Sequence, residues 1–207
     1  MSNLVNKYIG LAGLACVIAG CSVLSKPAPV ANDQYMLEYQ AVSEQDVVDD
    51  APVLLVTIPR AHGGYDTTGI AYMQQPYGLR YYTRSHWADT PARMLAPLVA
   101  DAMQTTGRFQ ALYTTPGSIA ADLRLDMELI RFHQDFTRQP GAMQVTLRAL
   151  LIDLQENRVI ATQQFDITEP VETEDAYGGV VAANRAVGRL LDDLTGFCLA
   201  NQPRQGN

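Results

Sequence analysis

The sequence has few cysteines and a deficit of basic residues, and each shortage excludes a class of protein. Its 207 residues include three cysteines, which are too few for a disulfide framework. Lysine and arginine together number 15 against 22 acidic residues, so the net charge is -7. Nucleic-acid binders carry basic surfaces, and we therefore expect no nucleic acid among the partners. Hydrophobic residues make up 47% of the chain, which is enough to build a core and argues against a wholly disordered protein.

The chain also lacks a hydrophobic run long enough to cross a membrane. Its most apolar segment, residues 8–18, has the length of a signal-peptide core, whereas a spanning helix needs about 20 residues. The segment ends in Ile18-Ala19-Gly20-Cys21, which resembles the bacterial lipobox. We expect residues 1–20 to be removed as a lipoprotein signal peptide and Cys21 to carry covalent lipid. An ordinary secretory signal with an incidental cysteine is the open alternative.

Residues 21–33 are predicted to be the acylated cysteine and a tether. The segment contains Pro27 and Pro29 and shows no hydrophobic periodicity, as expected of a linker. Residue 22 is serine rather than aspartate, and the lipobox resemblance then implies an anchor in the outer membrane, on its periplasmic face. The acyl chains provide the attachment, since each buried methylene contributes about 0.8 kcal/mol. The remaining Cys198 is expected to be a buried, unreactive thiol on a helix; a reactive or intermolecular thiol is the alternative.

The body, residues 34–200, is predicted to be a single α+β domain, in which a mostly antiparallel sheet carries two main helices on one side. Strands are expected over residues 35–39, 53–58, 69–74, 79–84, 109–113, 122–132, 143–154 and 159–167. Strict alternation over 122–129 predicts one dry and one wet face, and the turn 75–78 predicts a hairpin.

Two helices complete the predicted body. Thr90 and Pro91 are typical of a helix start and Gly107 of its end, while Pro97 predicts a kink or a displaced first turn. A second helix is expected from Val180 onwards. Residues 201–207 are polar and are expected to form a disordered tail.

No pattern in the sequence is typical of a catalytic or metal site. His62, His86 and His133 do not share the spacing of metal ligands, and Gly178-Gly179 fits no phosphate-binding motif. The alternating carboxylates Asp122, Asp126 and Glu128 could form an acid–base pair, but pairing with arginines on a neighbouring strand is the simpler interpretation. We expect no enzyme, no metal and no cofactor apart from the lipid on Cys21.

Aromatic residues are concentrated in one short region of the chain. Five tyrosines and the only tryptophan fall within residues 65–87: Tyr65, Tyr72, Tyr77, Tyr81, Tyr82 and Trp87. Packing in the core and in the hairpin would explain some of them. A surface that contacts a partner or lipid would explain the rest, because such rings bury area and keep a polar tip.

Four stretches, taken together with the lipobox, resemble the ABC-type transport auxiliary lipoproteins, which include the PqiC-like proteins. They are residues 64–72 (GYDTTGIAY), 81–95 (YYTRSHWADTPARML), 121–136 (ADLRLDMELIRFHQDF) and 179–186 (GVVAANRA). The resemblance implies a non-enzymatic lipoprotein that works beside an MCE-type ABC transporter, which moves phospholipid or other hydrophobic cargo between the inner and outer membranes. It also implies a fold related to the N-terminal domain of TolB, and assembly into homo-oligomers.

Two functions remain open at this stage. In the first, the protein is a docking subunit that receives an MCE-domain protein through the aromatic region. In the second, it acts alone as a lipid-binding or envelope-remodelling lipoprotein, which predicts a deep apolar cavity or clustered carboxylates.

Overall fold

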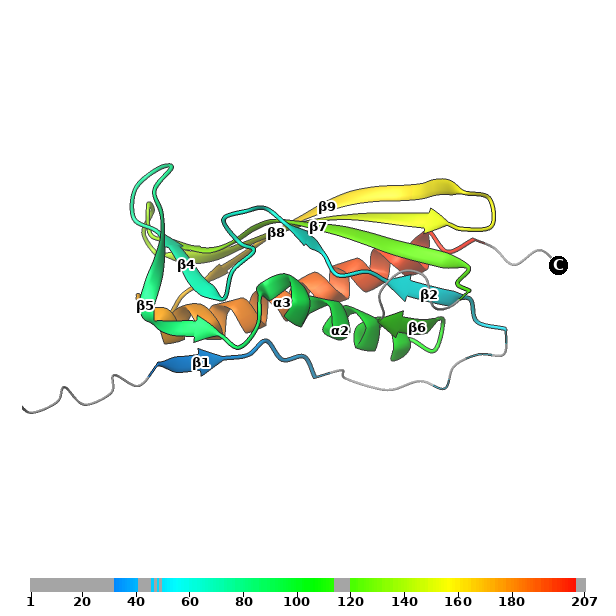
Figure 1. Ribbon diagram of the computed structural model, residues 1–207, viewed down its shortest axis with the longest axis horizontal. Coiled ribbons are helices and arrows are strands. Elements are labelled where there is room, and N and C mark those ends of the chain that lie inside the picture. Colours follow the sequence, from blue (N-terminus) through cyan, green and yellow to red (C-terminus); the bar gives the residue numbers. More distant parts are fainter. Residues whose placement is uncertain (1–31, 41–45, 47, 49, 114–119, 204–207) are drawn as a thin grey trace, which may run out of the picture. The chain divides into compact units, whose positions relative to one another are not determined.

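A computed structural model describes residues 32–40, 46, 48, 50–113 and 120–203 (Figure 1). The predicted signal peptide, Cys21, the tether up to residue 31 and residues 204–207 of the predicted tail lie outside the described residues. Residues 32–207 form one compact unit. Its elements are β1 (Asp33–Tyr35), β2 (Val53–Val56), β3 (Arg60–Ala61), β4 (Gly69–Met73), β5 (Leu79–Trp87), α2 (Pro91–Gln104), β6 (Gln110–Tyr113), β7 (Leu123–Asp135), β8 (Ala142–Asp153), β9 (Arg158–Pro170) and α3 (Ala176–Ala200).

The long strand β7 joins the two parts of the sheet. On one edge it pairs antiparallel with β8, and β8 pairs antiparallel with β9, which confirms the predicted three-strand meander. On the other edge β2, β3 and β4 follow one another along β7, and each runs parallel to it. The fold is therefore α+β with one mixed sheet, in which most of the paired residues belong to antiparallel strands.

The parallel pairs correct the sequence-based expectation. The hairpin of β4 and β5 is antiparallel as predicted, but β2 also runs parallel to β6, and β1 runs parallel to β5. Parallel neighbours are connected by long crossovers, and here the hairpin and α2 lie between β2 and β6 in the chain. Hydrophobic alternation indicates that a strand exists and not which partner it takes. It also missed the two-residue β3 and placed the first strand at 35–39 instead of 33–35.

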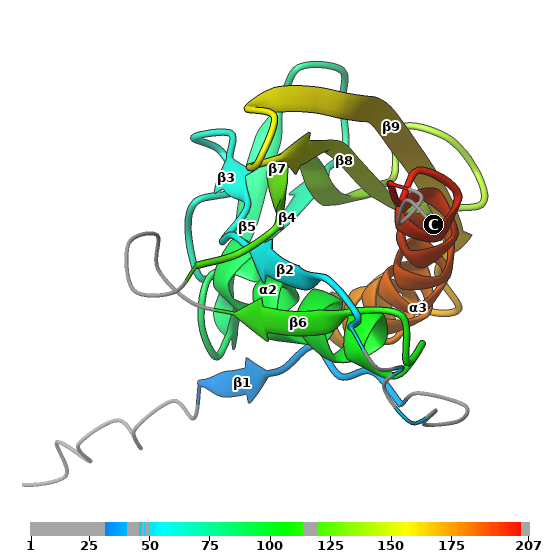
Figure 2. The ribbon, with the colours of Figure 1, turned by 90° about the vertical axis from the view of Figure 1, so that its right-hand side faces the viewer.

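Both helices pack on the dry face of the sheet and share one core with it (Figure 2). α2 begins at Pro91 with Thr90 as its N-cap, as predicted, and continues through Pro97. It lies against β6 and β2, while α3 lies against β8 and β9. α3 begins four residues before the predicted start, because the Asp175 carboxylate accepts a hydrogen bond from the Gly178 N–H. The centre of the core is filled by large apolar side chains such as Leu125, Leu147 and Leu190.

A β-bulge interrupts the alternation of β7. Up to Leu129 the odd-numbered residues point into the core, as the sequence predicts. The register against β8 shifts between Leu129 and Arg131, so Ile130 is the extra residue. Beyond it the even-numbered Phe132 and Gln134 are buried at 2% and 0% exposure. The alternation seen in the sequence therefore holds for only part of the strand.

Cys198 lies on α3 and is fully buried, as the sequence analysis predicted. Burial raises the pKa of its thiol to about 12. Among the described residues, no helix is long and apolar enough to cross a membrane.

Candidate functional site at the hairpin end of the sheet

Three of the six aromatic residues singled out from the sequence are packing residues. Trp87 is 2% exposed and meets Phe132 edge to face, with ring centroids 5.7 Å apart. The rings of Tyr72 and Tyr82 lie 4.6 Å apart and are both partly buried. Burial is the main cause that raises the pKa of Tyr82 to about 12. These three side chains hold the hairpin to the body.

Tyr65 is held against His133 of β7. Its hydroxyl lies 2.9 Å from the Nδ1 atom of His133, and the two rings stack with centroids 5.7 Å apart. Burial raises the pKa of Tyr65 and lowers the pKa of His133, because both charged forms lose contact with water. The pair joins the segment before β4 to the outer face of the sheet.

The other two tyrosines are open to solvent. Tyr77 is 100% exposed and occupies the turn between β4 and β5 with a φ of 65°. Tyr81 is 41% exposed, and its hydroxyl donates to the Gly64 carbonyl at 3.0 Å. The exposed aromatic surface is therefore the tip and outer side of the hairpin, which projects from the sheet at the end where β4 and β5 are labelled in Figure 1.

A hollow of about 410 Å³ lies beside this hairpin tip. It is lined by Met73, Pro76, Tyr77, Arg131, His133, Asp135, Arg138 and Gln144. The bulge at Ile130 explains this lining, because it turns three successive odd-numbered residues of β7 to the outer face. Regular alternation from Leu129 would have pointed Arg131 and His133 into the core.

The hollow contains one acidic side chain, which is hydrogen-bonded, and two arginines that have no close carboxylate partner in the described part of the chain. Asp135 is held in place, since its Oδ1 atom accepts hydrogen bonds from the Thr137 N–H at 2.8 Å and the Thr137 hydroxyl at 2.6 Å. Neither Arg131 nor Arg138 has a carboxylate within 4.0 Å among the residues that the structure describes. Sequence reasoning missed both arginines. The available signal was the adjacent Arg131 and Phe132, which break the period of two.

The carboxylates considered as an acid–base pair have structural partners instead. Glu128 accepts hydrogen bonds from Arg60 and, across the strand pair, from Arg148, both at 2.9 Å. The hydrogen bond from Arg60 is the largest cause that lowers the pKa of Glu128. Asp126 pairs with Arg124 at 3.0 Å. Cross-strand pairing with arginine, the simpler interpretation, is confirmed for Glu128.

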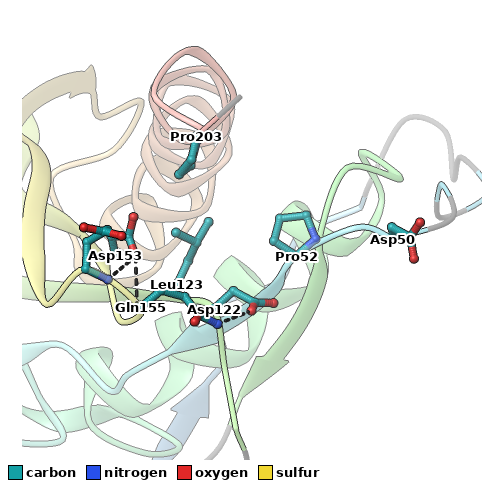
Figure 3. Close-up of a pocket in the computed structure, with 8 residues that line it drawn as sticks. Asp50, Pro52, Asp122, Leu123, Asp153, Gln155 and Pro203 are labelled. Carbon is teal, nitrogen blue, oxygen red and sulfur yellow. Dashed lines mark hydrogen bonds between the residues drawn. The ribbon is translucent and has the colours of Figure 1, made fainter. Parts of the chain in front are cut away.

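A second hollow, of about 330 Å³, lies near the start of β7 and contains several acidic side chains (Figure 3). Asp122 accepts from the Val53 N–H at 2.9 Å and from the Gln155 amide at 3.1 Å. Asp153 accepts from the N–H groups of Gln155 and Glu156. These carboxylates close the β8–β9 turn and fasten β2. No group of three or more metal-ligating side chains was found among the described residues.

Gly178 and Gly179 are explained by close packing at the start of α3. A Cβ atom on Gly178 would lie 2.1 Å from the Thr173 carbonyl oxygen, and one on Gly179 would lie 2.2 Å from the Gln134 side chain. The Gln134 amide nitrogen donates to the Asp175 carbonyl at 2.8 Å, which fixes this arrangement. The two glycines therefore bring the helix start onto β7.

Comparison with known proteins identifies the family of this chain. The model of the family described as the ABC-type transport auxiliary lipoprotein component matches residues 35–195. The chain belongs to this family. Membership makes it an auxiliary component of ABC-type transport with a non-catalytic role, and, as a lipoprotein, it is attached to a membrane.

Solved structures support the fold of this auxiliary lipoprotein. It is similar to protein XCC0632 from Xanthomonas campestris, of family DUF330, with a TM-score of 0.73 and 24% sequence identity over 81% of this chain and 95% of that one. An uncharacterized protein matches with a TM-score of 0.63 and 12% identity over 81% of this chain and 98% of that one. No match was found among the curated proteins. The relation to TolB stays a prediction.

Proposed function

We propose that this auxiliary lipoprotein is a docking subunit, anchored in the outer membrane through Cys21, that receives the MCE-domain protein of an ABC transporter for phospholipid or other hydrophobic cargo. The body is the part that binds, and the tether keeps it near the membrane. The family match over residues 35–195 supports a role in ABC-type transport. The MCE partner, the cargo, the outer membrane and a homo-oligomeric state are parts of the proposal.

The observation that carries the docking role is the exposed hairpin tip. Tyr77 is 100% exposed on a turn that the rest of the hairpin holds rigidly, through Trp87 in the core and the Tyr72–Tyr82 ring pair. A tyrosine side chain has few rotatable bonds and so loses little conformational freedom when a partner covers it, and such residues are frequent at the centre of interfaces. Its neighbour Tyr81 extends the same surface.

The filled core favours docking over the alternative of a lipid-binding protein that acts alone. A lipid carrier needs an apolar cavity of several hundred Å³. Here the space between the sheet and the helices is occupied by side chains with almost no exposure, such as Leu95, Leu129 and Leu194. The two hollows described above are both lined in part by exposed residues at the surface.

Co-purification of the MCE-domain protein with the acylated lipoprotein tests the proposal. Tyr77→Asn removes the ring, and asparagine tolerates the positive φ of the turn, so the fold is kept. We expect about tenfold weaker binding, as for an aromatic residue at the centre of an interface. Tyr177→Asn is the matched control, because Tyr177 is 62% exposed and lies on α3 rather than on the hairpin. Equal recovery with wild type and both variants would remove the hairpin tip from the interface.

A further inference from the structure

The hairpin of β4 and β5 carries arginines and no carboxylates, although the protein as a whole is acidic. Residues 69–88 include Arg80 and Arg84 and contain no aspartate or glutamate. Arg131 and Arg138 line the hollow of about 410 Å³ beside the tip. None of these four guanidinium groups has a carboxylate within 4.0 Å among the described residues.

A β-bulge and a turn place the two arginines in the hollow. The extra residue Ile130 turns Arg131 and His133 outward, and the β7–β8 turn brings Arg138 to the same hollow. Bulges are frequent next to binding sites because they redirect side chains without breaking the sheet. The Gln144 side chain, whose residue pairs with His133 across β7 and β8, completes the polar wall.

The donors of the hollow come from different directions. Arg131 and His133 are on β7, Gln144 is on β8 and Arg138 is on the turn that follows β7. His133 is 6% exposed and its Nδ1 atom is occupied by Tyr65, so its ring forms part of the wall of the hollow. Burial lowers the pKa of His133, so near neutral pH the ring is uncharged. The charge available to a ligand therefore comes from the two guanidinium groups, offset by Asp135 in the lining and in part by Asp166 of β9, which interacts with Arg131.

We propose that this hollow binds a phosphate group, either the phosphodiester of a lipid headgroup or a free phosphate. Guanidinium groups match phosphate oxygens in geometry and form strong charge-assisted hydrogen bonds with them. The lining contains two arginines and one aspartate, an excess of positive charge that suits an anionic phosphate group. Met73, Pro76 and the ring of Tyr77 supply apolar contact at the rim for the carbon atoms next to the phosphate.

A tetrahedral phosphate fits this arrangement better than a carboxylate. A carboxylate is planar and is satisfied by one guanidinium group in a bidentate pair. The hollow offers donors from three separate segments, and a phosphate with several acceptor oxygens can use all of them. This inference does not depend on the docking role of the hairpin tip, since it rests on Arg131 of β7 and Arg138 of the β7–β8 turn.

Titration calorimetry of the full-length acylated lipoprotein, held in an uncharged detergent, tests the site by measuring the binding of four probes. The probes are glycerophosphoglycerol, which is a soluble phosphodiester headgroup, inorganic phosphate, glycerol without phosphate, and a glutamate-rich peptide. We expect the phosphate-containing probes to bind and glycerol not to bind. Arg131→Gln and Arg138→Gln should each weaken binding about tenfold, and Arg131→Lys should weaken it less.

Arg158→Gln is the matched control, because Arg158 is an exposed arginine at the start of β9 with no carboxylate within 4.0 Å among the described residues. It should bind as wild type does. Tighter binding of glycerophosphoglycerol than of phosphate identifies a lipid headgroup as the source, and the reverse order identifies free phosphate. The proposal is overturned if neither phosphate probe binds, if the Arg131 and Arg138 variants bind as Arg158→Gln does, or if the glutamate-rich peptide binds most tightly, which would indicate a protein partner.

Discussion

At the scale of single residues, two glycines of α3 with identical chemistry have opposite roles. Gly178 lies in the first turn, where a Cβ atom would meet the backbone oxygen of Thr173 at 2.1 Å. Gly188 lies in the middle of the same helix, and a Cβ atom there would meet nothing within 4 Å. Position 178 requires glycine because the helix backbone lies close to Thr173. At position 188 glycine makes no such contact and only lowers the helix propensity of the sequence.

Gly178→Ala is therefore expected to lower the free energy of unfolding by about 1–3 kcal/mol, because a backbone oxygen cannot move aside easily. Gly188→Ala should raise it by about 0.5–1 kcal/mol. Urea unfolding followed by circular dichroism measures both. A neutral or stabilising Gly178→Ala variant would contradict the close contact with Thr173.

Cys198 gives a prediction for alkaline pH. Its pKa is about 12 in the folded protein and rests near 9 in an unfolded chain, so the folded state disfavours the thiolate. Folding stability is unaffected by this group below pH 9 and declines as the pH rises from about 9 towards 12, because the unfolded chain releases the proton more readily.

Cys198 should resist a disulfide reagent at pH 8 and react fully in denaturant. Rapid labelling of the native protein would show that the thiol is accessible.

At the scale of elements, the bulge in β7 decides which residues enter the core. A regular strand continuing from Leu129 would bury Arg131, whereas the bulged strand buries Phe132. Phe132→Ala is expected to cost about 3–5 kcal/mol, and Arg131→Ala less than about 0.5 kcal/mol. Chemical denaturation of the two variants, measured under the same conditions, distinguishes a bulged β7 from a regular one. A larger loss for Arg131→Ala than for Phe132→Ala would mean that the strand is regular.

Asn184 of α3 holds the segment that follows β1. Its Oδ1 atom accepts from the Glu38 N–H at 2.8 Å, and its Nδ2 atom donates to the Met36 carbonyl at 3.3 Å. Asn184→Ala should speed hydrogen exchange at the Glu38 amide by about tenfold, since the loss of one such bond costs about 0.5–1.5 kcal/mol. Asn201→Ala is the control, because among the described residues the Asn201 side chain bonds to its own helix, at the Phe197 carbonyl. Unchanged exchange at Glu38 in Asn184→Ala would show that the segment is held by other contacts.

The same elements show how far sequence reasoning reaches. Alternation along residues 122–154 correctly predicted the meander, the turn at 75–78 the hairpin, and the signals at Thr90 and Pro91 the start of α2, because these patterns are local. The helix expected from Val180 onwards is contained in α3. The parallel partners of β2 and β4 depend on contacts between residues about 60–70 positions apart, which no local pattern contains. The hollow was missed for a related reason, since Arg131 and Arg138 become neighbours only through the bulge and the turn.

At the scale of the whole molecule, the expected lipid anchor would attach the protein to the membrane, while the folded body is the part that binds partners. Removal of the predicted signal peptide would take away Lys7 and leave 14 basic against 22 acidic residues, a net charge of -8, so the chain from Cys21 onwards would not be drawn to anionic headgroups in general. Attachment is then expected to rest on the acyl chains alone.

Cys21→Ala should leave the protein unacylated and release it from the membrane fraction, because no lipid remains to hold it. Metabolic labelling with palmitate and membrane fractionation measure the two effects together. Ser22→Ala, next to the modified residue, is the control and should be labelled as wild type is. Palmitate incorporation into Cys21→Ala would overturn the predicted anchor.

The attachment of β1 also has a mechanical consequence. Any tension on the predicted anchor enters the body at residue 32, where β1 holds β5 through only three paired positions and Asn184 holds the next segment. These contacts are the first in the line of force. If they open, residues 32–52 join the linker, whose contour length grows by about 70 Å at roughly 3.3–3.6 Å per residue, while β2 and the rest of the sheet stay folded. The lipoprotein could then extend under load by withdrawing Leu37 from the core, and recoil while the strands from β2 to β9 stay folded.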